Sequence, residues 1–384
     1  MAEAKEIITP EQDTVVTEPD AGTSELLPVS APRTLGEIII SQLASLHNYH
    51  RGVIEAGSVE AVHKMRVTTR RLQASLDLLE REMKVRKHKK RLRSWRRKLS
   101  TVRNYDVFLE LIEKEAANKR KTRRAQLELV KAILQDRRVR RAVKVTQFLQ
   151  DIKIDDIGVR LGLISVPNVS SSSENTSADI SANESPVEPL AVEPIDVANF
   201  VDERKVAAYA AERLDQRLTE FQALAALSLP TNDPSELHQL RIAAKRVRYL
   251  LETVTQMGFG DATRALAWLR TLQDRIGDWH DLEALEEEIV LIVSTREFMK
   301  QHFAESSQML QAAAHIQTKK EKLVAKLFPV RVPRLLELTC IRVTKTLRRY
   351  SISRTKAASK TPVRKTRNST SKNPSPTLES VRRF

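Results

Sequence analysis

Apolar residues recur three and four positions apart over most of the chain, a spacing that places them on one face of a helix. Runs of alternating β-branched residues between turn-forming residues, which would indicate strands, are not seen. The pattern therefore predicts an all-α fold. The expected helices span residues 35–56, 59–83, 85–101, 106–152, 200–227, 236–256, 262–275, 281–315 and 333–350.

Three stretches lack the helical period. Residues 1–33 are polar and acidic, residues 161–199 contain no lysine or arginine, and residues 351–384 are rich in Ser, Thr, Lys and Arg. Segments of such composition bury too little apolar surface to fold, so we expect disordered tails at both ends. The helical domain between them, 34–350, divides into a first half, 34–160, an acidic linker, 161–199, and a second half, 200–350.

A ten-residue stretch in the first half returns in the second. Residues 63–72, HKMRVTTRRL, resemble residues 238–247, HQLRIAAKRV, and the two copies start 175 positions apart. Similarity at a long interval indicates that one structural unit occurs twice in the chain. The repeat therefore predicts two related helical bundles joined by the acidic linker.

Both copies carry basic residues on one face of the expected helix and apolar residues on the opposite face, at about 100° per residue. The basic faces contain His63, Arg66 and Arg70 in the first copy and His238, Arg241, Lys245 and Arg248 in the second, with Arg71 and Arg246 to one side. Arginine suits phosphate because its planar guanidinium donates two parallel hydrogen bonds. The histidines are open to two interpretations, since a helical histidine is more often a packing residue than a ligand.

The expected helix after the first copy is also basic. No acidic residue occurs between Glu82 and Asp106, and like charges four positions apart repel each other along a helix. A surface with only a structural role would interleave acids here, so the run favours an anionic partner. The side of this helix that faces away from its apolar stripe carries Arg86, Lys90, Arg93 and Arg97.

The charge balance of the whole chain agrees with this interpretation. Lys and Arg outnumber Asp and Glu by 65 to 49, a net charge of +16, which favours polyanions or anionic surfaces as partners. Cys340 is the only cysteine, so the chain can form no internal disulfide and a reducing cytoplasm is expected. Neither a secretory signal nor a run of about 18 apolar residues is apparent, so no transmembrane segment is predicted.

The repeated helices resemble the signature helices of the CHAD domain, the conserved histidine α-helical domain. The resemblance includes residues 102–107, VRNYDV, which are similar to the family's Arg-Asp-x-Asp-Val stretch, with Asn104 in place of an acidic residue. It also includes residues 272–281, LQDRIGDWHD, which are similar to the family's Leu-Gly-x-x-x-Asp stretch. Together these motifs cover about residues 34–350, apart from the linker.

The resemblance implies two pseudo-symmetric bundles around a basic central cavity that binds inorganic polyphosphate. The residues that the resemblance places at this site are His63, Arg66, Arg70, Arg71, His238, Arg241, Lys245, Arg246 and Arg248. From the charge pattern we add Lys90, Arg93 and Arg97 of the basic helix and Tyr249 beside the second basic face. Association with polyphosphate granules and with polyphosphate-metabolising enzymes would follow from such binding. No Glu-x-Glu-x-Lys signature of a triphosphate-tunnel hydrolase occurs in the chain.

Nothing in the sequence indicates an enzyme, a cofactor or a metal site. Cys340 lies among apolar residues, which favours a buried packing role, and the acids around His280 and Asp281 fit the start of a helix better than a metal site. Gly-rich phosphate loops and nucleophile elbows are not found. Two other functions stay open: binding of a nucleic-acid backbone, and an adaptor role in which the basic tail docks acidic proteins or anionic lipid.

Overall fold

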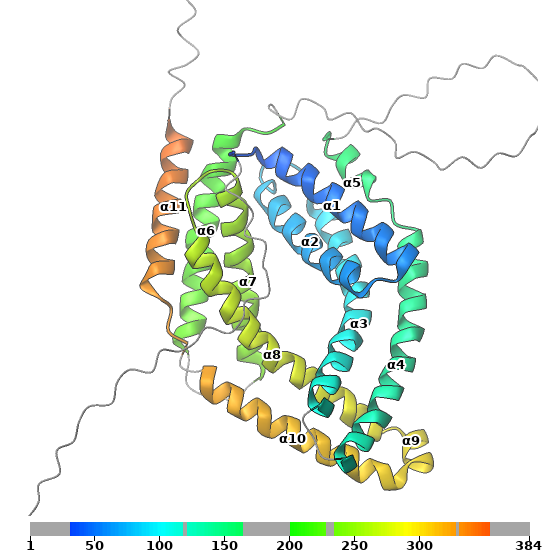
Figure 1. Cartoon of the computed structure of the whole chain (residues 1–384). Helices are drawn as coiled ribbons and strands as arrows, with labels where there is room; N and C mark the ends of the chain where they lie inside the picture. The colour runs from blue at the N-terminus through cyan, green and yellow to red at the C-terminus, as the bar shows by residue number, and fades with distance from the viewer. Residues whose placement is uncertain (1–30, 118–120, 164–199, 228–233, 328–329, 354–384) are drawn as a thin grey trace, which may run out of the picture.

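The computed structural model of the chain describes residues 31–117, 121–163, 200–227, 234–327 and 330–353 (Figure 1). These residues form helices and the turns between them, and no strand occurs among them, so the expected all-α fold is confirmed. Most of the predicted tails and of the predicted linker lies outside the described residues. Where the structure does describe their edges, Leu161 and Leu163 are buried and the last helix continues to Ile352.

Among the described residues, the first half contains five helices and the second half contains six. Their bounds are α1 Leu35–Ala56, α2 Val59–Leu78, α3 Arg86–Ala117, α4 Lys121–Gln150, α5 Asp155–Arg160, α6 Glu203–Ala226, α7 Pro234–Gln256, α8 Thr263–Val293, α9 Arg296–Gln301, α10 Phe303–Leu327 and α11 Arg334–Ile352. In the first half α1, α2, α3 and α4 pack in succession, and in the second half α6, α7, α8 and α10 do the same. The internal repeat is therefore accompanied by a repeated order of packed neighbours.

The corner between α1 and α2 is fixed by local signals. Thr34 caps α1 in a capping box with Glu37, and the helix ends at Gly57, whose φ of 56° is readily adopted by glycine. Ser58 then accepts a hydrogen bond from the Ala61 amide and starts α2. This start places the first copy of the repeat on an uninterrupted helix.

Two helix breaks expected from the sequence do not occur. Residues 102–105 lie inside α3 and residues 276–280 lie inside α8, because neither stretch contains proline and Gly277 is the only weak helix former in them. The described part of α3 ends at Ala117 and α4 begins at Lys121. Near Ser294 and His302 the expected helix over 281–315 divides into α8, α9 and α10. The acids around Asp281 are therefore in the middle of a helix, not at its start.

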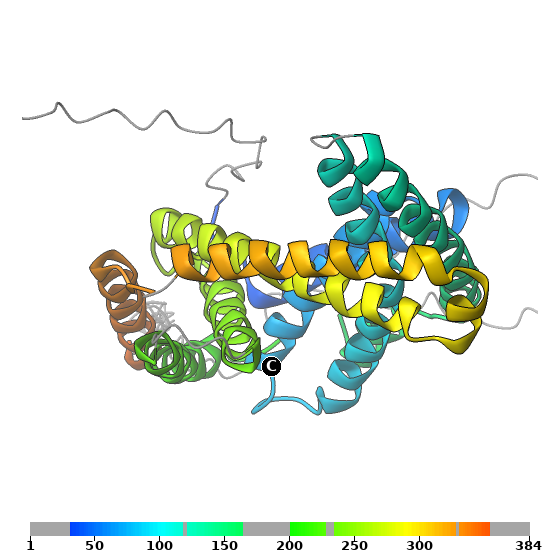
Figure 2. The same cartoon turned by 90° about the horizontal axis from the view of Figure 1, so that it is seen from below.

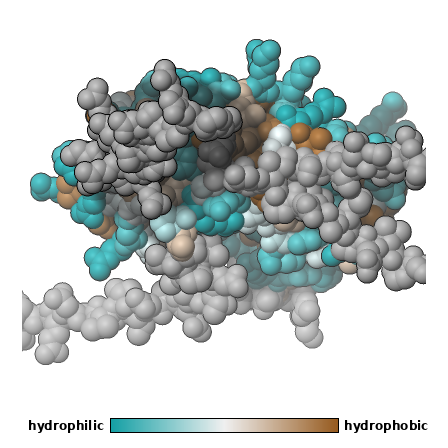
Figure 3. Space-filling model, turned by 90° about the horizontal axis from the view of Figure 1, so that it is seen from above, coloured by the Kyte–Doolittle hydropathy of each residue, from teal (hydrophilic) through white to brown (hydrophobic). Residues whose placement is uncertain are grey.

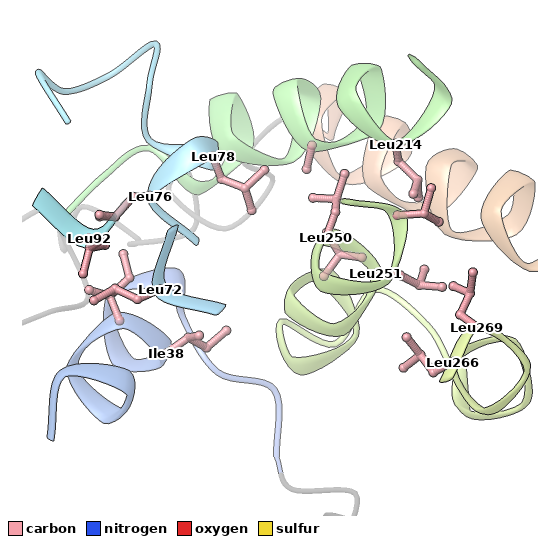
Figure 4. Close-up of a cluster of buried hydrophobic side chains, with 14 of the residues drawn as sticks. Ile38, Leu72, Leu76, Leu78, Leu92, Leu214, Leu250, Leu251, Leu266 and Leu269 are labelled. Carbon is pink, nitrogen blue, oxygen red and sulfur yellow. The ribbon is translucent and has the colours of Figure 1, made fainter. Parts of the chain in front are cut away.

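The two halves share one hydrophobic core. Figure 4 shows Leu72, Leu76 and Leu92 of the first half and Leu250, Leu251 and Leu269 of the second half in one cluster of buried side chains. Among these, Leu72, Leu76, Leu92 and Leu251 are completely buried. Burial of this kind stabilises a protein by about 1.5–3 kcal/mol per large apolar side chain. The shared core fixes α2 against α7.

A second core joins the halves at the other end of the molecule. Phe108 and Ile112 of α3, Leu134 of α4 and Leu285 and Ile289 of α8 are buried together. The long helices α3, α4, α8 and α10 extend beyond the first core and meet here, as Figures 1 and 2 show. Seen from above, the described surface is mostly hydrophilic, and hydrophobic side chains are visible between the hydrophilic ones (Figure 3).

Candidate anion-binding cleft

The two repeat helices face each other across a cleft. α2 packs against α7, and each helix buries its apolar stripe in the shared core. The opposite stripe of α2 points His63, Arg66 and Arg70 into a hollow of about 790 Å³, and α7 points Arg241 and Lys245 into the same hollow. The sequence pattern of two basic faces therefore becomes one basic wall in space.

Cations greatly outnumber anions in this cleft. Of the described residues, those that line the cleft include nine arginines and lysines but only two acids, Asp77 and Asp281. The nine cations are Arg66, Arg70, Arg93, Arg96, Arg103, Arg217, Arg241, Lys245 and Arg246.

Only two of the nine cations have a carboxylate partner within 4 Å in the described part of the chain. Arg217 Nη2 lies 3.1 Å from Asp77 Oδ2, and Arg246 Nη1 lies 2.7 Å from Glu220 Oε1. Buried polar groups in proteins are normally paired, yet the Nε atoms of Arg66 and Arg241 are buried without a hydrogen-bond acceptor. The cleft is thus built from cations that lack counter-charges.

The crowding changes the acid–base properties of the cleft. Burial, followed by the charges of Arg70 and Arg103, lowers the pKa of Arg66 to about 9, which still leaves it protonated at neutral pH. Burial, followed by the charges of Arg70 and Arg241, lowers the pKa of Lys245 to about 6. Both shifts have the direction expected for desolvated cations next to like charges. A polyanion that neutralised most of the cluster would oppose both shifts.

The two repeat histidines, His63 and His238, also have lowered pKa values. Burial, followed by the charge of Arg103, lowers the pKa of His63 below its usual range. Burial, followed by His280 and Arg241, lowers the pKa of His238. Both histidines line the cleft, so each is placed to gain a proton and a second hydrogen-bond donor when an anion arrives.

A second hollow, of about 580 Å³, lies between α8 and α10 and has the opposite character. Its lining includes four glutamates and the apolar side chains of Leu237, Trp279 and Val324. Lys320 is buried there and contacts Glu283 and Glu286. This hollow is unsuited to a polyanion.

A model of the CHAD domain family matches residues 37–290 of the chain. The chain belongs to the CHAD family. Its helices α9 to α11 follow the matched region. No curated protein matches the chain.

Two solved structures are similar to this CHAD protein. The crystal structure of the CHAD domain from the plant Ricinus communis is 19% identical, with a TM-score of 0.50, and the match covers 83% of this chain and 95% of that one. PptA from Streptomyces chartreusis is 16% identical, with a TM-score of 0.47, and the match covers 77% of this chain and 99% of that one. The first of these comparisons supports the helical fold.

The CHAD cleft contains nine of the thirteen residues expected from the sequence. They are His63, Arg66, Arg70, Arg93, His238, Arg241, Lys245, Arg246 and Tyr249.

The other four expected residues do not line the cleft. Glu252 is 8% exposed and attracts Arg71 and Arg248, whose Nε atoms lie 3.4 and 3.5 Å from its carboxylate. Lys90 and Arg97 are exposed on α3, outside the lining of the cleft. A role of Lys90 and Arg97 in binding stays a prediction.

Several cleft residues were missing from the expected set. On α3 the cleft face is formed by Arg93, Arg96, Ser100 and Arg103, spaced three and four apart. These four residues are recognised as one face only if the helix continues through residue 103. The helix expected from the sequence ended at residue 101, so this face was not identified. Arg217 of α6 carries no comparable sequence signal, because its place in the cleft depends on how α6 packs beside α7.

Cys340 and Glu288 both have neighbours within the fold. Cys340 is 1% exposed, and burial raises the pKa of its thiol to about 12. Glu288 accepts hydrogen bonds from Tyr105 and Arg137. In the part of the chain that the structure describes, no group of three or more His, Cys, Asp or Glu residues is placed to hold a metal ion. No helix in the same part is long and apolar enough to cross a membrane.

Proposed function

We propose that this CHAD domain binds inorganic polyphosphate in the cleft between α2 and α7 and does not catalyse its breakdown. The observation that carries the proposal is that seven arginine and lysine side chains from both repeats and from α3 face one cleft with no carboxylate within 4 Å among the described residues. A linear polyphosphate carries about one negative charge per phosphate, so it supplies the missing counter-charges in a row. Family membership supports the same ligand.

The aromatic residues favour a phosphate chain over single-stranded nucleic acid. Base stacking on exposed aromatic rings contributes about 1–3 kcal/mol per base in proteins that bind single strands. Tyr249, which lines the cleft, is only 6% exposed, and the guanidinium of Arg248 lies 4.7 Å from its ring centroid. Phe108, the other Phe, Tyr or Trp residue in the lining, is 4% exposed. No ring is therefore offered for stacking by the described lining of the cleft.

The acids of the cleft favour binding without hydrolysis. Enzymes that cleave phosphoanhydride bonds hold Mg²⁺ with carboxylates. Asp77 is already engaged by Lys89 and Arg217, which leaves Asp281 as the one other acid among the described lining residues. We therefore expect no release of inorganic phosphate when the pure protein is incubated with polyphosphate and Mg²⁺.

The decisive experiment is a competition of long polyphosphate against DNA and RNA at about 0.15 M salt. It compares the wild type with an Arg66→Ala/Arg241→Ala variant, and the matched control is Lys345→Ala/Arg349→Ala, which removes the same charge from exposed positions on α11. We expect polyphosphate to displace both nucleic acids from the wild type. The cleft variant should lose at least about tenfold in polyphosphate affinity and part of the salt dependence, whereas the control should stay within about twofold.

Two results would contradict the proposal. Equal loss of polyphosphate binding in the cleft and control variants would indicate only a generic cationic surface. Loss of binding on truncation after residue 353, with the cleft variant unaffected, would favour the adaptor function of the basic tail.

A further inference from the structure

Lys245 differs from the other well-buried lysines of the protein. Lys89 and Lys320 are also largely buried, but Lys89 pairs with Asp77 and Lys320 with two glutamates, and these partners raise the pKa of both amines. Lys245 has no carboxylate within 4 Å among the described residues. It lines the open cleft, so small solutes can reach it.

The charged side chains that lower the pKa of Lys245 are all arginines. Arg66 and Arg70 face it from α2, and Arg241 and Arg248 flank it on α7. The same cleft is lined by Arg96 and Arg103 of α3 and by Arg217 of α6, with Asp281 of α8 as the nearby acid that faces Arg66 and Arg241.

This environment produces a reactive amine. Arginine keeps its proton in almost any protein site, so a crowded cluster relieves its repulsion by deprotonating its lysine. With a pKa of about 6, most Lys245 side chains are neutral at about pH 7, whereas an ordinary lysine is neutral in only about one molecule in three thousand. A desolvated lysine beside cationic groups is a recognised way of generating a nucleophilic amine.

We propose that Lys245 is an acylation site that reacts with small acyl phosphates. The phosphate group of the reagent docks between Arg66, Arg70 and Arg241, which brings its carbonyl carbon close to the Lys245 amine. Nζ attacks this carbon, the amide N–C bond forms and the C–O bond to phosphate breaks. One proton moves from Nζ to the departing phosphate, so the products are an N-acyl-lysine and inorganic phosphate.

The modification would permanently prevent Lys245 from becoming a cation in the cleft. An acylated lysine cannot regain its proton when a polyanion arrives, and the acyl group occupies part of the cleft. Acylated protein should therefore bind polyphosphate at least about tenfold more weakly. This consequence, unlike the acylation itself, rests on the proposed function.

The test incubates the full chain with acetyl phosphate at about pH 7 and follows acetylation of each lysine by mass spectrometry. We expect Lys245 to react at least about ten times faster than Lys345, an exposed lysine on α11. A neutral acetylating reagent, an N-hydroxysuccinimide ester, should show a smaller preference because it gains nothing from the arginines. A Lys245 rate equal to or below that of Lys345 with acetyl phosphate would overturn the proposal.

Polyphosphate binding is measured on the same protein before and after treatment, with Lys245→Arg as the matched variant. Treatment should weaken binding by the wild type and leave Lys245→Arg at its own untreated value. Normal polyphosphate binding with an unreactive Lys245 would reject the acylation site and keep the proposed function. Rapid acetylation of Lys245 in a protein that does not bind polyphosphate would keep the acylation site and reject the proposed function.

Discussion

The imidazole of His238 stacks on that of His280, with ring centroids 5.5 Å apart and 29° between the ring planes. One ring comes from the repeat helix α7 and the other from α8, and both line the cleft. Two stacked imidazoles repel each other when both are protonated, and His280 is the second cause, after burial, of the low pKa of His238. The stack therefore adds to the effect of burial and disfavours protonation of His238 in the empty cleft.

Polyphosphate should raise the pKa of His238. In the free protein its pKa lies below the usual value of about 6.5, and an anion in the cleft stabilises the protonated ring. Binding is then accompanied by proton uptake, so affinity should increase as pH falls from about 7 to 5.5. Titration of the His238 ring proton by NMR, with and without polyphosphate, measures this directly. An unchanged pKa would mean that the anion does not reach α7.

Two adjacent arginines of α2 should behave differently on substitution. Arg70 lines the cleft with no carboxylate within 4 Å among the described residues, whereas Arg71 pairs with Glu252 of α7. Arg70→Ala should weaken polyphosphate binding about tenfold without loss of stability, because it removes a like charge. Arg71→Ala should leave binding within about twofold and lower the free energy of unfolding by about 1 kcal/mol. Binding assays and urea unfolding of both variants check the contrast; equal effects of the two substitutions on binding would contradict it.

Sequence periodicity was sufficient to predict the all-α class and the basic faces of the two repeat helices. The expected range of the first helix, 35–56, equals that of α1, because its cap residues and apolar stripe give the same signal. The basic faces of α2 and α7 were predicted from a repeat that needs no knowledge of tertiary structure.

Which other residues line the cleft depends on tertiary packing. Arg71 looks like a cleft residue in the sequence, but it turns toward Glu252, which lies 181 positions away and becomes its neighbour only in the fold. Arg248 pairs with the same Glu252 four positions along α7, a contact that helical spacing does indicate. Arg217 belongs to a helix with no repeat motif and reaches the cleft because α6 packs on α7. Such pairings across helices cannot be derived from spacing along one helix.

Lys245 should make the stability of the empty protein depend on pH. Its pKa of about 6 in the folded state lies below the value of about 10.5 expected when unfolded, so the unfolded chain holds more protons between these two values. The free energy of unfolding should therefore rise as pH increases from about 6 toward 10.5. Below about pH 6 both states are protonated and this contribution becomes constant.

A Lys245→Met variant isolates this contribution. It should be more stable than the wild type by about 2 kcal/mol at about pH 7, with a gain that shrinks as pH approaches 10. The matched control, Lys345→Met on the exposed face of α11, should change stability by less than about 0.5 kcal/mol at every pH. Chemical unfolding at several pH values provides the measurement, and a gain that stays constant with pH would show that Lys245 is protonated in the folded state.

Gly277 of α8 lies beside the guanidinium of Arg241. A Cβ atom at this position of α8 would lie 3.5 Å from Arg241 Nη2, an ordinary contact distance. Gly277→Ala should therefore be tolerated and should stabilise the helix by up to about 1 kcal/mol, with polyphosphate binding within about twofold of the wild type. Gly277→Leu carries further atoms into the space of the guanidinium and should displace Arg241, with at least about a fivefold loss of affinity. Circular dichroism confirms that both variants are folded, and binding assays compare them; equal affinities for the Ala and Leu variants would show that Arg241 takes no part in holding the anion.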